Sequence, residues 1–342
     1  MIISRTPFRV SFFGGGTDYE PWFREHGGAV LATSIDKYCY LNCRFLPPFF
    51  DYQSRLVWSE IECVTERNQI RHPVIRAVLE MLKIEDGVEI HHNADLPARS
   101  GLGSSSSFTN AMLLAAYALI GKMISKRDLA EKAVYVEREL LHENVGVQDQ
   151  IQTAFGGFNK ILIARDGGFT VEPVIAPKSR IAHFHEHLML FFTGVSRNAS
   201  DIAAEQIASI GNKQTELRAM RALVDEGERI LTGNGDLRDF GRLLHDGWQL
   251  KRGLSAKIAP AFVDDVYDKA RQAGAIGGKL LGAGGGGFML FFVPPERQPR
   301  VLAELHGLIH VPFAFETGGA QLIYYDAPDV LPARGAQTAI AC

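Results

Sequence analysis

Hydrophobic and polar positions alternate along this chain with two different periods. Apolar residues at every second position indicate half-buried strands, and apolar residues at every third or fourth position indicate amphipathic helices. The two patterns are interspersed, which is typical of an α+β fold. The expected strands are residues 2–5, 8–13, 29–35, 38–45, 56–58, 87–92, 158–164, 169–175, 187–193, 288–293, 311–316 and 321–325, and the expected helices are residues 72–81, 105–120, 125–141, 215–231, 237–251, 260–273 and 296–308.

The length of the chain indicates more than one folding unit. Its 342 residues exceed the ~100 to 200 residues of a typical domain, so two domains are expected. The segment 177–180 is the expected crossing between them, which predicts domains at 1–178 and 179–342. A binding site is expected in the cleft between two such domains.

One loop combines the features of a phosphate-binding site. The stretch 95–107 contains Gly101 and Gly103, ends in four serines and leads directly into the apolar helix pattern at 108–120. A loop of this kind presents unpaired backbone N–H groups and the positive end of the helix dipole to one point in space. An ordinary serine-capped helix start is the alternative explanation of the same residues.

A second glycine-rich segment, 14–16, lies at the end of a predicted strand. Three glycines there mean that the backbone touches another group closely or turns tightly. Thr17, Asp18 and Tyr19 follow with a hydroxyl, a carboxylate and a phenol, a set that suits a polyhydroxylated ligand. A plain turn with a hydrogen bond from Asp18 explains them equally simply.

The third glycine-rich segment, 282–287, is neither a dinucleotide fingerprint nor a P-loop. It satisfies G-x-G-x-x-G formally, but that fingerprint opens a helix, whereas the strand pattern 288–293 follows here. The pair Gly278-Lys279 is followed by leucine where a P-loop requires Ser or Thr, and Ala273 stands where the first glycine is required. Both nucleotide-binding motifs are therefore excluded.

The charge balance argues against a nucleic-acid-binding protein. The chain has 36 Lys and Arg against 39 Asp and Glu, a net charge of −3, and its sequence contains no basic stripe. The first residues lack the apolar core of a signal peptide, and no run approaches the ~20 apolar residues that span a membrane. We therefore expect a cytoplasmic protein with no membrane or nucleic-acid partner, as a monomer or homodimer.

The three glycine-rich segments resemble the motifs of the GHMP kinases, the family of galactokinase, homoserine kinase, mevalonate kinase and phosphomevalonate kinase. The first family motif corresponds to residues 7–10 and 17–19, with glycines at 14–16 in place of the usual Gly-Glu-His. The second motif, P-x-x-x-G-L-G-S-S, matches residues 97–105 without departure, and the third, K-x-x-G-A-G-x-G-G, matches residues 279–287. The resemblance spans nearly the whole chain.

This resemblance implies a two-domain GHMP kinase fold and an ATP-dependent kinase activity. The N-terminal domain is expected to be similar to a ribosomal protein domain, and the C-terminal domain to be ferredoxin-like. By the same resemblance, Ser105 and Glu137 would hold Mg²⁺, and Arg9 and Asp149 would be the catalytic pair. The implied ATP-binding residues are Pro97, Arg99, Ser100, Gly101, Leu102, Gly103, Ser104, Ser105 and Ser106.

The residues themselves suggest how such a catalytic pair would act. An aspartate beside an arginine stays ionised, because the opposite charge favours the carboxylate. We therefore expect Asp149 to orient the acceptor hydroxyl and to take its proton late, while Arg9 stabilises charge on the migrating phosphoryl group. Glu137 and Asp149 lie twelve positions apart and share one pocket only if the chain folds back after Gly146; otherwise surface charge explains both.

The Gly-Gly-Gly-Thr-Asp form of the first motif resembles the D-glycero-D-manno-heptose 7-phosphate kinase group, as do residues 146–150, 193–200 and 248–252. This resemblance implies transfer to the anomeric hydroxyl of a sugar that already carries a phosphate. Such a phosphate needs a cationic pocket, for which Arg197, Lys251 and Arg252 are candidates, although solvated helix charges explain them too. The implied substrate contacts are Gly15, Gly16, Thr17, Asp18, Tyr19, Arg197, Lys251, Gly284 and Gly285.

Three other functions remain open at this point. One is a kinase for an unphosphorylated sugar such as fucose or galactose. Another is a catalytically silent sugar sensor on the same fold, against which the joint presence of Arg9, Ser105, Glu137 and Asp149 counts. The third is nucleic-acid binding, suggested by the ribosomal-protein-like N-terminal domain and opposed by the acidic balance.

Overall fold

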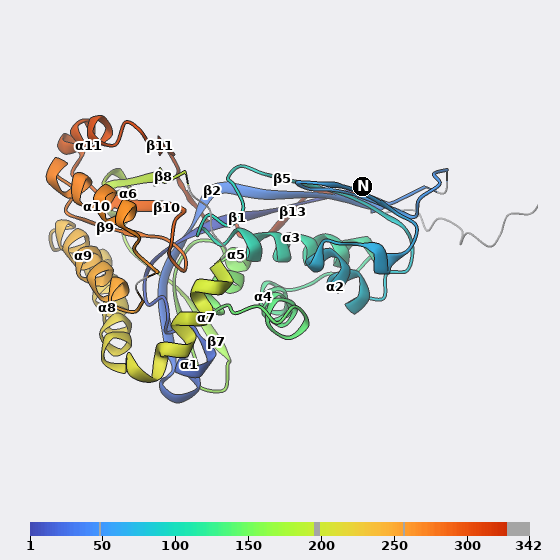
Figure 1. The fold of residues 1–342 in the computed structure, drawn as a ribbon, viewed down its shortest axis with the longest axis horizontal. Helices are drawn as coiled ribbons and strands as arrows, with labels where there is room; N and C mark the ends of the chain where they lie inside the picture. The colour runs from blue at the N-terminus through green and yellow to red at the C-terminus, as the bar shows by residue number, and fades with distance from the viewer. Residues whose placement is uncertain (48, 195–198, 256, 327–342) are drawn as a thin grey trace, which may run out of the picture.

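The computed structural model describes residues 1–47, 49–194, 199–255 and 257–326, in which strands and helices are interspersed (Figure 1). The strands are β1 (Ile2–Phe13), β2 (Gly28–Phe45), β3 (Ser54–Val57), β4 (Ile61–Val64), β5 (Val88–Ala94), β6 (Phe158–Ile163), β7 (Phe169–Pro173), β8 (Leu188–Phe192), β9 (Gly277–Leu280), β10 (Phe288–Phe292), β11 (Ile309–His310), β12 (Phe315–Glu316) and β13 (Gln321–Tyr325). The helices are α1 (Glu20–His26), α2 (Pro73–Met81), α3 (Ser104–Leu119), α4 (Lys126–Tyr135), α5 (Gln148–Phe155), α6 (Lys178–Glu186), α7 (Ala199–Ser209), α8 (Gln214–Thr232), α9 (Arg238–Arg252), α10 (Ala261–Ala273) and α11 (Gln298–Glu304), with short helical segments η1 (Arg67–Gln69), η2 (Val136–Leu140), η3 (Ile210–Asn212) and η4 (Pro295–Arg297).

The described strands form two sheets. The larger has nine strands in the order β13-β1-β2-β5-β3-β4, with β12 and β6 also paired to β2 and β7 paired to β6. The smaller has four strands in the order β11-β8-β10-β9. Helices pack on both sheets, so the expected α+β class is confirmed (Figure 1). The division at residue 178 stays a prediction. β12 and β13 follow this residue in sequence but pair with β2 and β1, so the larger sheet contains strands from both sides of the division.

The two longest strands each join segments that were expected to be separate. β1 runs through Thr6 and Pro7, and β2 runs through Asp36 and Lys37. The pairing passes from Pro7 opposite Tyr38 to the next residue opposite Ile35, so two residues of β2 bulge out at this point. Proline lacks an N–H donor and is tolerated at such an irregularity. The alternation of apolar and polar residues is interrupted at this irregular pairing, although both strands continue through it.

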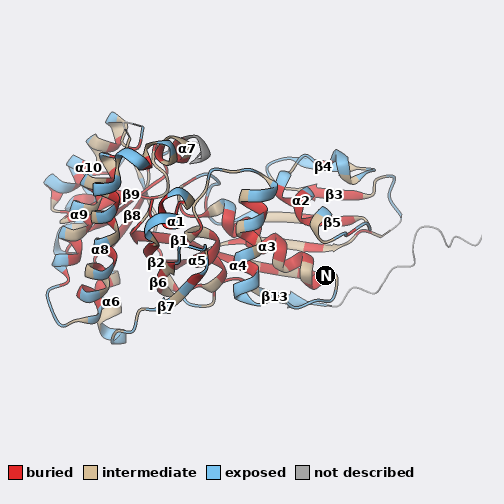
Figure 2. Cartoon of the chain, turned by 90° about the horizontal axis from the view of Figure 1, so that it is seen from below, coloured by how far each residue is buried: buried red, intermediate tan, exposed pale blue. Residues whose placement is uncertain are grey.

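Helix α3 is the central helix beneath the larger sheet, flanked by α2, α4 and α5 (Figure 1). Twelve of its 16 residues are buried, and the burial colouring shows the same inner position (Figure 2). Two of its buried polar side chains bond to neighbouring elements: the Ser107 hydroxyl donates to the carbonyl of Pro7 at 2.8 Å, and Asn110 Nδ2 donates to the carbonyl of Gln150 at 2.9 Å. These bonds hold α3 between β1 and α5, so its N-terminus has a defined place.

The helix expected at 125–141 is present, but its last turn is not α-helical. It divides into α4 and η2, where the N–H of Leu141 bonds to the carbonyl of Val136, five residues earlier, in the π-helical pattern. Helices α1, α5 and α6 were not expected at all. No described helix is long and apolar enough to cross a bilayer.

An aromatic cluster joins the two halves of the chain. Phe240 of α9 lies with its ring centroid 5.4 Å from that of Phe12 on β1 and 4.7 Å from that of Phe184 on α6. All three side chains are buried. Such contacts stabilise through apolar burial and edge-to-face ring geometry, so the cluster holds α9 against the larger sheet.

Replacing Phe240 by alanine is expected to lower the free energy of unfolding by about 3 to 5 kcal/mol, because the change removes buried apolar surface and leaves a cavity. Urea unfolding followed by circular dichroism measures this loss. Phe49→Ala is the matched control, since Phe49 is 88% exposed. Equal stability of the two variants would contradict the importance of the cluster.

Candidate active site

The three glycine-rich segments that the sequence singled out meet at one cleft. This cleft has a volume of about 980 Å³ and is lined by Gly15 and Gly16 from the first segment, Gly101 and Gly103 from the second and Gly282 from the third. The segments are separated by up to some 270 positions in sequence, so only folding brings them together. Their shared position makes the cleft the candidate active site.

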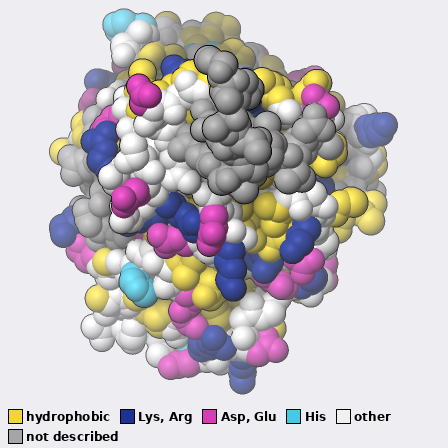
Figure 3. All heavy atoms as spheres, turned by 90° about the vertical axis from the view of Figure 1, so that its right-hand side faces the viewer, with side chains coloured by type: hydrophobic (Ala, Val, Ile, Leu, Met, Phe, Trp, Pro, Cys, Tyr) yellow, Lys and Arg dark blue, Asp and Glu magenta, His cyan; other side chains and the backbone are white. Residues whose placement is uncertain are grey.

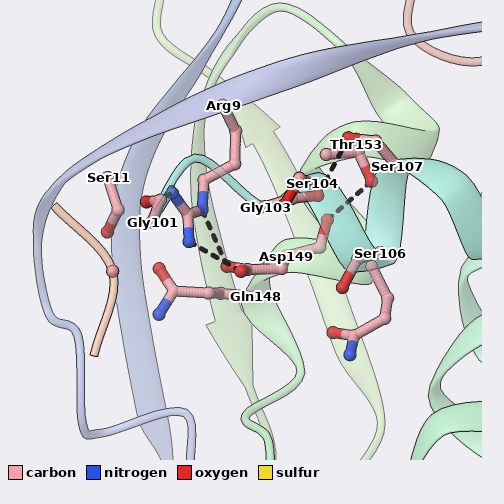
Figure 4. A network of polar contacts seen from close by, with 12 residues as sticks. Arg9, Ser11, Gly101, Gly103, Ser104, Ser106, Ser107, Gln148, Asp149 and Thr153 are labelled. Atoms are coloured by element: carbon pink, nitrogen blue, oxygen red, sulfur yellow. Dashed lines mark hydrogen bonds and ion pairs between the residues drawn. The ribbon is translucent and has the colours of Figure 1, made fainter. Parts of the chain in front are cut away.

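Arg9 and Asp149 form an ion pair that lines the cleft (Figure 4). Arg9 Nε donates to Asp149 Oδ1 at 2.7 Å, and Arg9 Nη2 donates to Asp149 Oδ2 at 2.6 Å. Arg9 Nη1 donates to the carbonyl of Gly101 at 2.6 Å. This bidentate arrangement fixes both planar groups. It places the pair against the glycine-rich loop 95–103 that precedes α3, called the phosphate loop below because the sequence predicts that role.

Helix α5 explains why Asp149 reaches this point. The chain around Gly146 has no regular secondary structure, and α5 begins at Gln148, one residue before Asp149. The Asn110 side chain of α3 donates to the hydroxyl of Thr153 at 2.8 Å, and that hydroxyl donates to the carbonyl of Asp149 at 2.7 Å. The first turn of α5 is therefore held beside the N-terminus of α3.

The second and third glycine-rich segments touch each other through their backbones. A Cβ atom on Gly101 would lie 2.5 Å from the carbonyl oxygen of Leu281, and one on Gly282 would lie 2.5 Å from the Cα of Gly101. Both glycines also have positive φ, +83° and +71°. Only glycine fits at both positions, so the motif glycines serve this close approach of two loops.

Glu137 is a fully buried carboxylate with one unused oxygen. Its Oε2 accepts from Gln150 Nε2 at 2.5 Å and from the Ser106 hydroxyl at 3.1 Å. Its Oε1 is buried without a hydrogen-bond partner among the described residues. Burial raises the pKa of the Glu137 carboxyl to about 8. An orphaned carboxylate oxygen beside a serine hydroxyl is a donor set that suits a hard cation such as Mg²⁺.

The serine beside Glu137 is Ser106, one position beyond the expected Ser105. The side chain of Ser105 is exposed on the cleft lining. Gly103, in the left-handed conformation, stands at the N-cap, and the Ser104 hydroxyl accepts from the N–H of Arg99 at 3.1 Å. The four serines thus have different surroundings, which their identical side chains did not reveal.

Asp18 lies deep in the cleft with its carboxylate fully buried. Its Oδ1 accepts from the N–H of Gly16 at 2.9 Å, and its Oδ2 accepts from Gln148 Nε2 at 3.0 Å. Burial, together with the charge of Asp149, raises the pKa of the Asp18 carboxyl. Gly146 packs directly on this carboxylate, and a Cβ there would overlap it. The Asp18 carboxylate is therefore held in one position on the cleft lining.

Tyr19 closes the same end of the cleft. It is 8% exposed, and its hydroxyl lies 3.5 Å from Gln206 Oε1 on α7. Gln206 Nε2 in turn donates to the carbonyl of Ala283 at 2.7 Å. The first and third glycine-rich segments are thus connected through α7.

The described structure brings most of the predicted site residues to the cleft. Those on its lining are Arg9, Gly15, Gly16, Asp18, Tyr19, Arg99, Gly101, Gly103, Ser104, Ser105, Ser106, Glu137, Asp149 and Lys251. Others lie outside that lining: Pro97, Thr17, Ser100, Leu102, Gly284 and Gly285.

The residues outside the lining have other contacts. The Thr17 hydroxyl donates to the carbonyls of Gly14 and Ala29 at 2.8 and 2.9 Å. Leu102 is fully buried, and its carbonyl accepts from the N–H of Arg9 at 2.9 Å. Gly285 donates its N–H to the carbonyl of Ile258 at 2.9 Å. These residues shape the loops, and nothing in the structure tests a direct ligand contact by them.

The expected cationic pocket is only partly described. Arg197 lies outside the described residues. Arg252 forms an ion pair with Asp264 at 3.0 Å, and Lys251 is 8% exposed and lines the cleft.

An aromatic end of the cleft was not expected from the sequence. Trp58, His72, His92 and Phe108 line it. His72 stacks on Phe108 with ring centroids 4.5 Å apart, and burial lowers the pKa of His72 to about 4. The four rings pack against one another and form an aromatic wall of the cleft. The four residues come from separate elements with no common spacing, so no sequence signal marks them.

The chain is similar to known proteins over most of its length. The family models for the GHMP kinases N terminal domain and the GHMP kinases C terminal match residues 68–157 and 219–308, together just over half of the chain. The chain is 26% identical to the D-glycero-alpha-D-manno-heptose 7-phosphate kinase of Campylobacter jejuni, covering 89% of this chain and 93% of that one. It is also 26% identical to the L-fucokinase/L-fucose-1-P guanylyltransferase of Bacteroides fragilis, covering 88% of this chain and 35% of that one.

One solved structure has a similar fold over almost the entire chain. It is the D-glycero-D-manno-heptose 1-phosphate kinase from Bacteroides thetaiotaomicron, with a TM-score of 0.79, 24% identity and coverage of 96% of this chain and all of that one. This likeness supports the expected two-domain fold.

Glu137→Gln is expected to change how stability depends on pH in metal-free buffer. The pKa of Glu137 is raised by burial, to about 8, so between its ordinary value and about 8 the folded protein holds a proton that the unfolded chain has lost. The wild type therefore loses stability as pH rises through this range, whereas the glutamine variant does not. Thermal unfolding with a chelator, from pH 5 to 9, measures the difference. Glu139→Gln, at an exposed position of the same segment, should have the pH dependence of the wild type. If stability depended on pH identically in the wild type and in Glu137→Gln, the raised pKa of Glu137 would be wrong.

Proposed function

The chain belongs to the GHMP kinase family of ATP-dependent phosphotransferases, and from that premise we propose that it phosphorylates the anomeric hydroxyl of D-glycero-D-manno-heptose 7-phosphate. The observation that carries the proposal is the Arg9–Asp149 ion pair, at 2.6 Å, on the cleft beside the phosphate loop. Phosphoryl transfer requires mainly positioning and charge neutralisation, and this pair offers a carboxylate for the acceptor and a guanidinium for the phosphoryl group.

The nucleotide would lie along the loop that precedes α3. The first amides of that helix have no intrahelical acceptor and, with the helix dipole, favour the phosphates. Gly101 and Gly103 allow these phosphates to approach the backbone. The base would then extend toward the aromatic end, where Trp58 lines the cleft. The distribution of side chains along the cleft supports this orientation.

Mg²⁺ would be held by Glu137 together with Ser105, whose exposed hydroxyl faces the cleft. Glu137 supplies the buried Oε1 that has no described partner, and Ser106 keeps the carboxylate oriented through its bond to Oε2. The ion, when bound, would neutralise charge on the nucleotide phosphates.

The acceptor hydroxyl would lie against Asp149. Both oxygens of this carboxylate accept from Arg9, at 2.7 and 2.6 Å, which fixes its orientation toward the acceptor. Asp149 would therefore orient the hydroxyl and take its proton late in the reaction, while Arg9 balances the charge that develops on the phosphoryl group. An anomeric hydroxyl is more acidic than other sugar hydroxyls, so a weak base suffices.

The heptose is favoured by similarity to the Campylobacter jejuni enzyme over 93% of that protein's length. Asp18 and Gln148 offer polar groups for sugar hydroxyls at the closed end of the cleft. A kinase for an unphosphorylated sugar is the second candidate, supported by the fucokinase relative. The cytoplasmic location and the monomeric or homodimeric state remain predictions.

A screen of ADP release over heptose 7-phosphate, other phosphosugars and free hexoses tests the proposal. Heptose 7-phosphate is expected to have the highest kcat/KM, and phosphorus–proton coupling in the product locates the new phosphate on the anomeric oxygen. A free hexose as the best substrate would favour the second candidate. Absence of ADP release with every sugar would favour a silent sensor.

Asp149→Asn is expected to lower kcat by about 10³-fold, the scale of a lost proton acceptor, and to leave the affinity for ATP nearly unchanged. Coupled ADP-release kinetics and calorimetric titration with ATP measure the two quantities separately. Asp86→Asn, at an exposed position far from the cleft lining, should retain wild-type kcat. A fully active Asp149→Asn enzyme would remove Asp149 from the mechanism.

Trp58→Ala is expected to raise the KM for ATP about tenfold, since stacking of a base on an aromatic ring contributes roughly 1 to 3 kcal/mol. The KM for the sugar should stay near the wild-type value, because Trp58 lies at the other end of the cleft lining. Tyr135→Ala, an aromatic change at a 48% exposed position, is the control. A rise in the sugar KM alone would reverse the orientation of the two substrates.

A further inference from the structure

Two buried lysines line the cleft without a carboxylate partner among the described residues. They are Lys251 on α9 and Lys279 on β9, each 8% exposed. Burying an ammonium group is costly unless an opposite charge or several hydrogen bonds compensate it. Two such groups in one cleft therefore indicate that something else supplies the negative charge.

The backbone satisfies each lysine only in part. Lys251 Nζ donates to the carbonyls of Leu280 and Gly282 at 2.9 and 2.5 Å. Lys279 Nζ donates to the carbonyls of Ser11 and Phe12 at 2.8 and 2.7 Å. An ammonium group has three N–H donors, so one donor of each lysine remains for a ligand.

The two lysines lie beside the phosphate loop. Gly282, which accepts from Lys251, abuts Gly101, and the carbonyl of Gly101 accepts from Arg9 Nη1 at 2.6 Å. Ser11, whose carbonyl accepts from Lys279, stands two positions after Arg9 on β1, and Figure 4 shows it next to the Arg9–Gly101 contact. Arg9, Lys251 and Lys279 thus approach one region from three elements.

A hydroxyl in the same region is also unused. Ser11 is 6% exposed and lines the cleft, and its Oγ is buried without a hydrogen-bond partner among the described residues. A buried polar atom of this kind calls for a ligand or water. It is a second observation, independent of charge, that points to a ligand at this place.

The charges of the region do not balance in the free protein. Both oxygens of Asp149 are occupied by Arg9, and Asp18, the other buried aspartate on the cleft lining, bonds to Gly16 and Gln148. The two lysines are left with a formal charge of up to two units, which matches a phosphate dianion. We propose that Lys251, Lys279 and Ser11 form a phosphate-binding subsite, with Lys251 donating directly to the phosphate.

The identity of the bound phosphate rests on the proposed function; the subsite does not. The same chemistry is offered by the terminal phosphate of the nucleotide as it is transferred and by the phosphate that the sugar already carries. Both are phosphate dianions, and both would enter this cleft. The experiment therefore uses one ligand for each source.

Protonation of Lys251 gives this subsite a measurable signature. The groups that face it are Arg9 from β1, Lys279 from β9 and two backbone carbonyls; Asp149 is held by Arg9. Burial and the charge of Arg9 lower the pKa of Lys251 to about 7, and burial and its cationic neighbours lower the pKa of Lys279 well below its usual range. Arrival of a phosphate dianion would restore the proton on Lys251.

Calorimetric titration at pH 7 in buffers of different ionisation enthalpy counts the protons taken up on binding. The ligands are a non-hydrolysable ATP analogue with Mg²⁺, ADP with Mg²⁺ and heptose 7-phosphate. The wild type is expected to take up about half a proton more than Lys251→Arg, because arginine stays charged throughout. Proton release from Glu137 on metal binding is common to both proteins and cancels in this difference.

The ligand that produces the difference identifies the source of the phosphate. A difference with the ATP analogue and not with ADP assigns the subsite to the transferred phosphate, and a difference with heptose 7-phosphate assigns it to the sugar. That ligand should also bind Lys251→Met about tenfold more weakly, the scale of a lost charge-assisted hydrogen bond. Equal proton counts in wild type and Lys251→Arg with both the analogue and the sugar phosphate would overturn the proposal.

Matched variants separate the subsite from stability and from turnover. Lys269→Met, at an exposed position of α10 that pairs with Asp265, should behave as wild type. If Lys251→Met does not fold, the comparison with Lys251→Arg still decides the question. A proton difference without any ADP release would refute the proposed kinase function and leave the subsite standing.

Discussion

The ion pair between Arg9 and Asp149 is the interaction on which the arrangement of the cleft depends. It joins β1, which pairs with β2 in the larger sheet, to the first turn of α5, and the contact of Arg9 with the carbonyl of Gly101 adds the phosphate loop. A guanidinium donates in a fixed planar fork, so the three elements must share one geometry. Arg9 is 3% exposed, and its charge is therefore screened only weakly by water.

Around this pair, the cleft keeps several groups that the free protein does not fully satisfy. Glu137 has an oxygen without a described partner, Asp18 is a carboxylate buried near another carboxylate, and Lys251 and Lys279 are buried cations held by carbonyls. Each arrangement is unfavourable for folding alone. Their concentration at one place is what a site for a cation and polyanionic ligands requires, because those ligands complete the missing charges and hydrogen bonds.

The face of the molecule in Figure 3 does not concentrate charge of one sign. On this face, Lys and Arg side chains are interspersed with Asp and Glu, without a continuous basic region among the described residues. Inside the cleft, by contrast, Arg9, Lys251 and Lys279 line one site. This distribution agrees with the small-molecule ligand expected from the sequence and with its net charge of −3.

Features that depend on residues adjacent in sequence were predictable from the sequence alone. The glycines and serines at 101–107 followed by an apolar helical period lead to a loop that opens α3, because local backbone freedom and hydrophobic spacing determine that structure. The motif order likewise led to the kinase family and to Arg9 and Asp149 as a pair. The start of α5 was not predicted, since the hydrogen bonds from α3 that hold it involve residues some 40 positions earlier.

The sequence alone therefore determined the chemistry that this chain carries: three glycine-rich loops, the helix behind one of them and the charged residues of a kinase. Only the tertiary structure decided which groups share a space. It placed Ser106 beside Glu137 and the Thr17 hydroxyl in a hydrogen bond to the carbonyl of Gly14. It also brought Lys251 and Lys279 next to the phosphate loop. The physical reason is that burial and electrostatic environment depend on contacts between distant segments, and no local pattern encodes them.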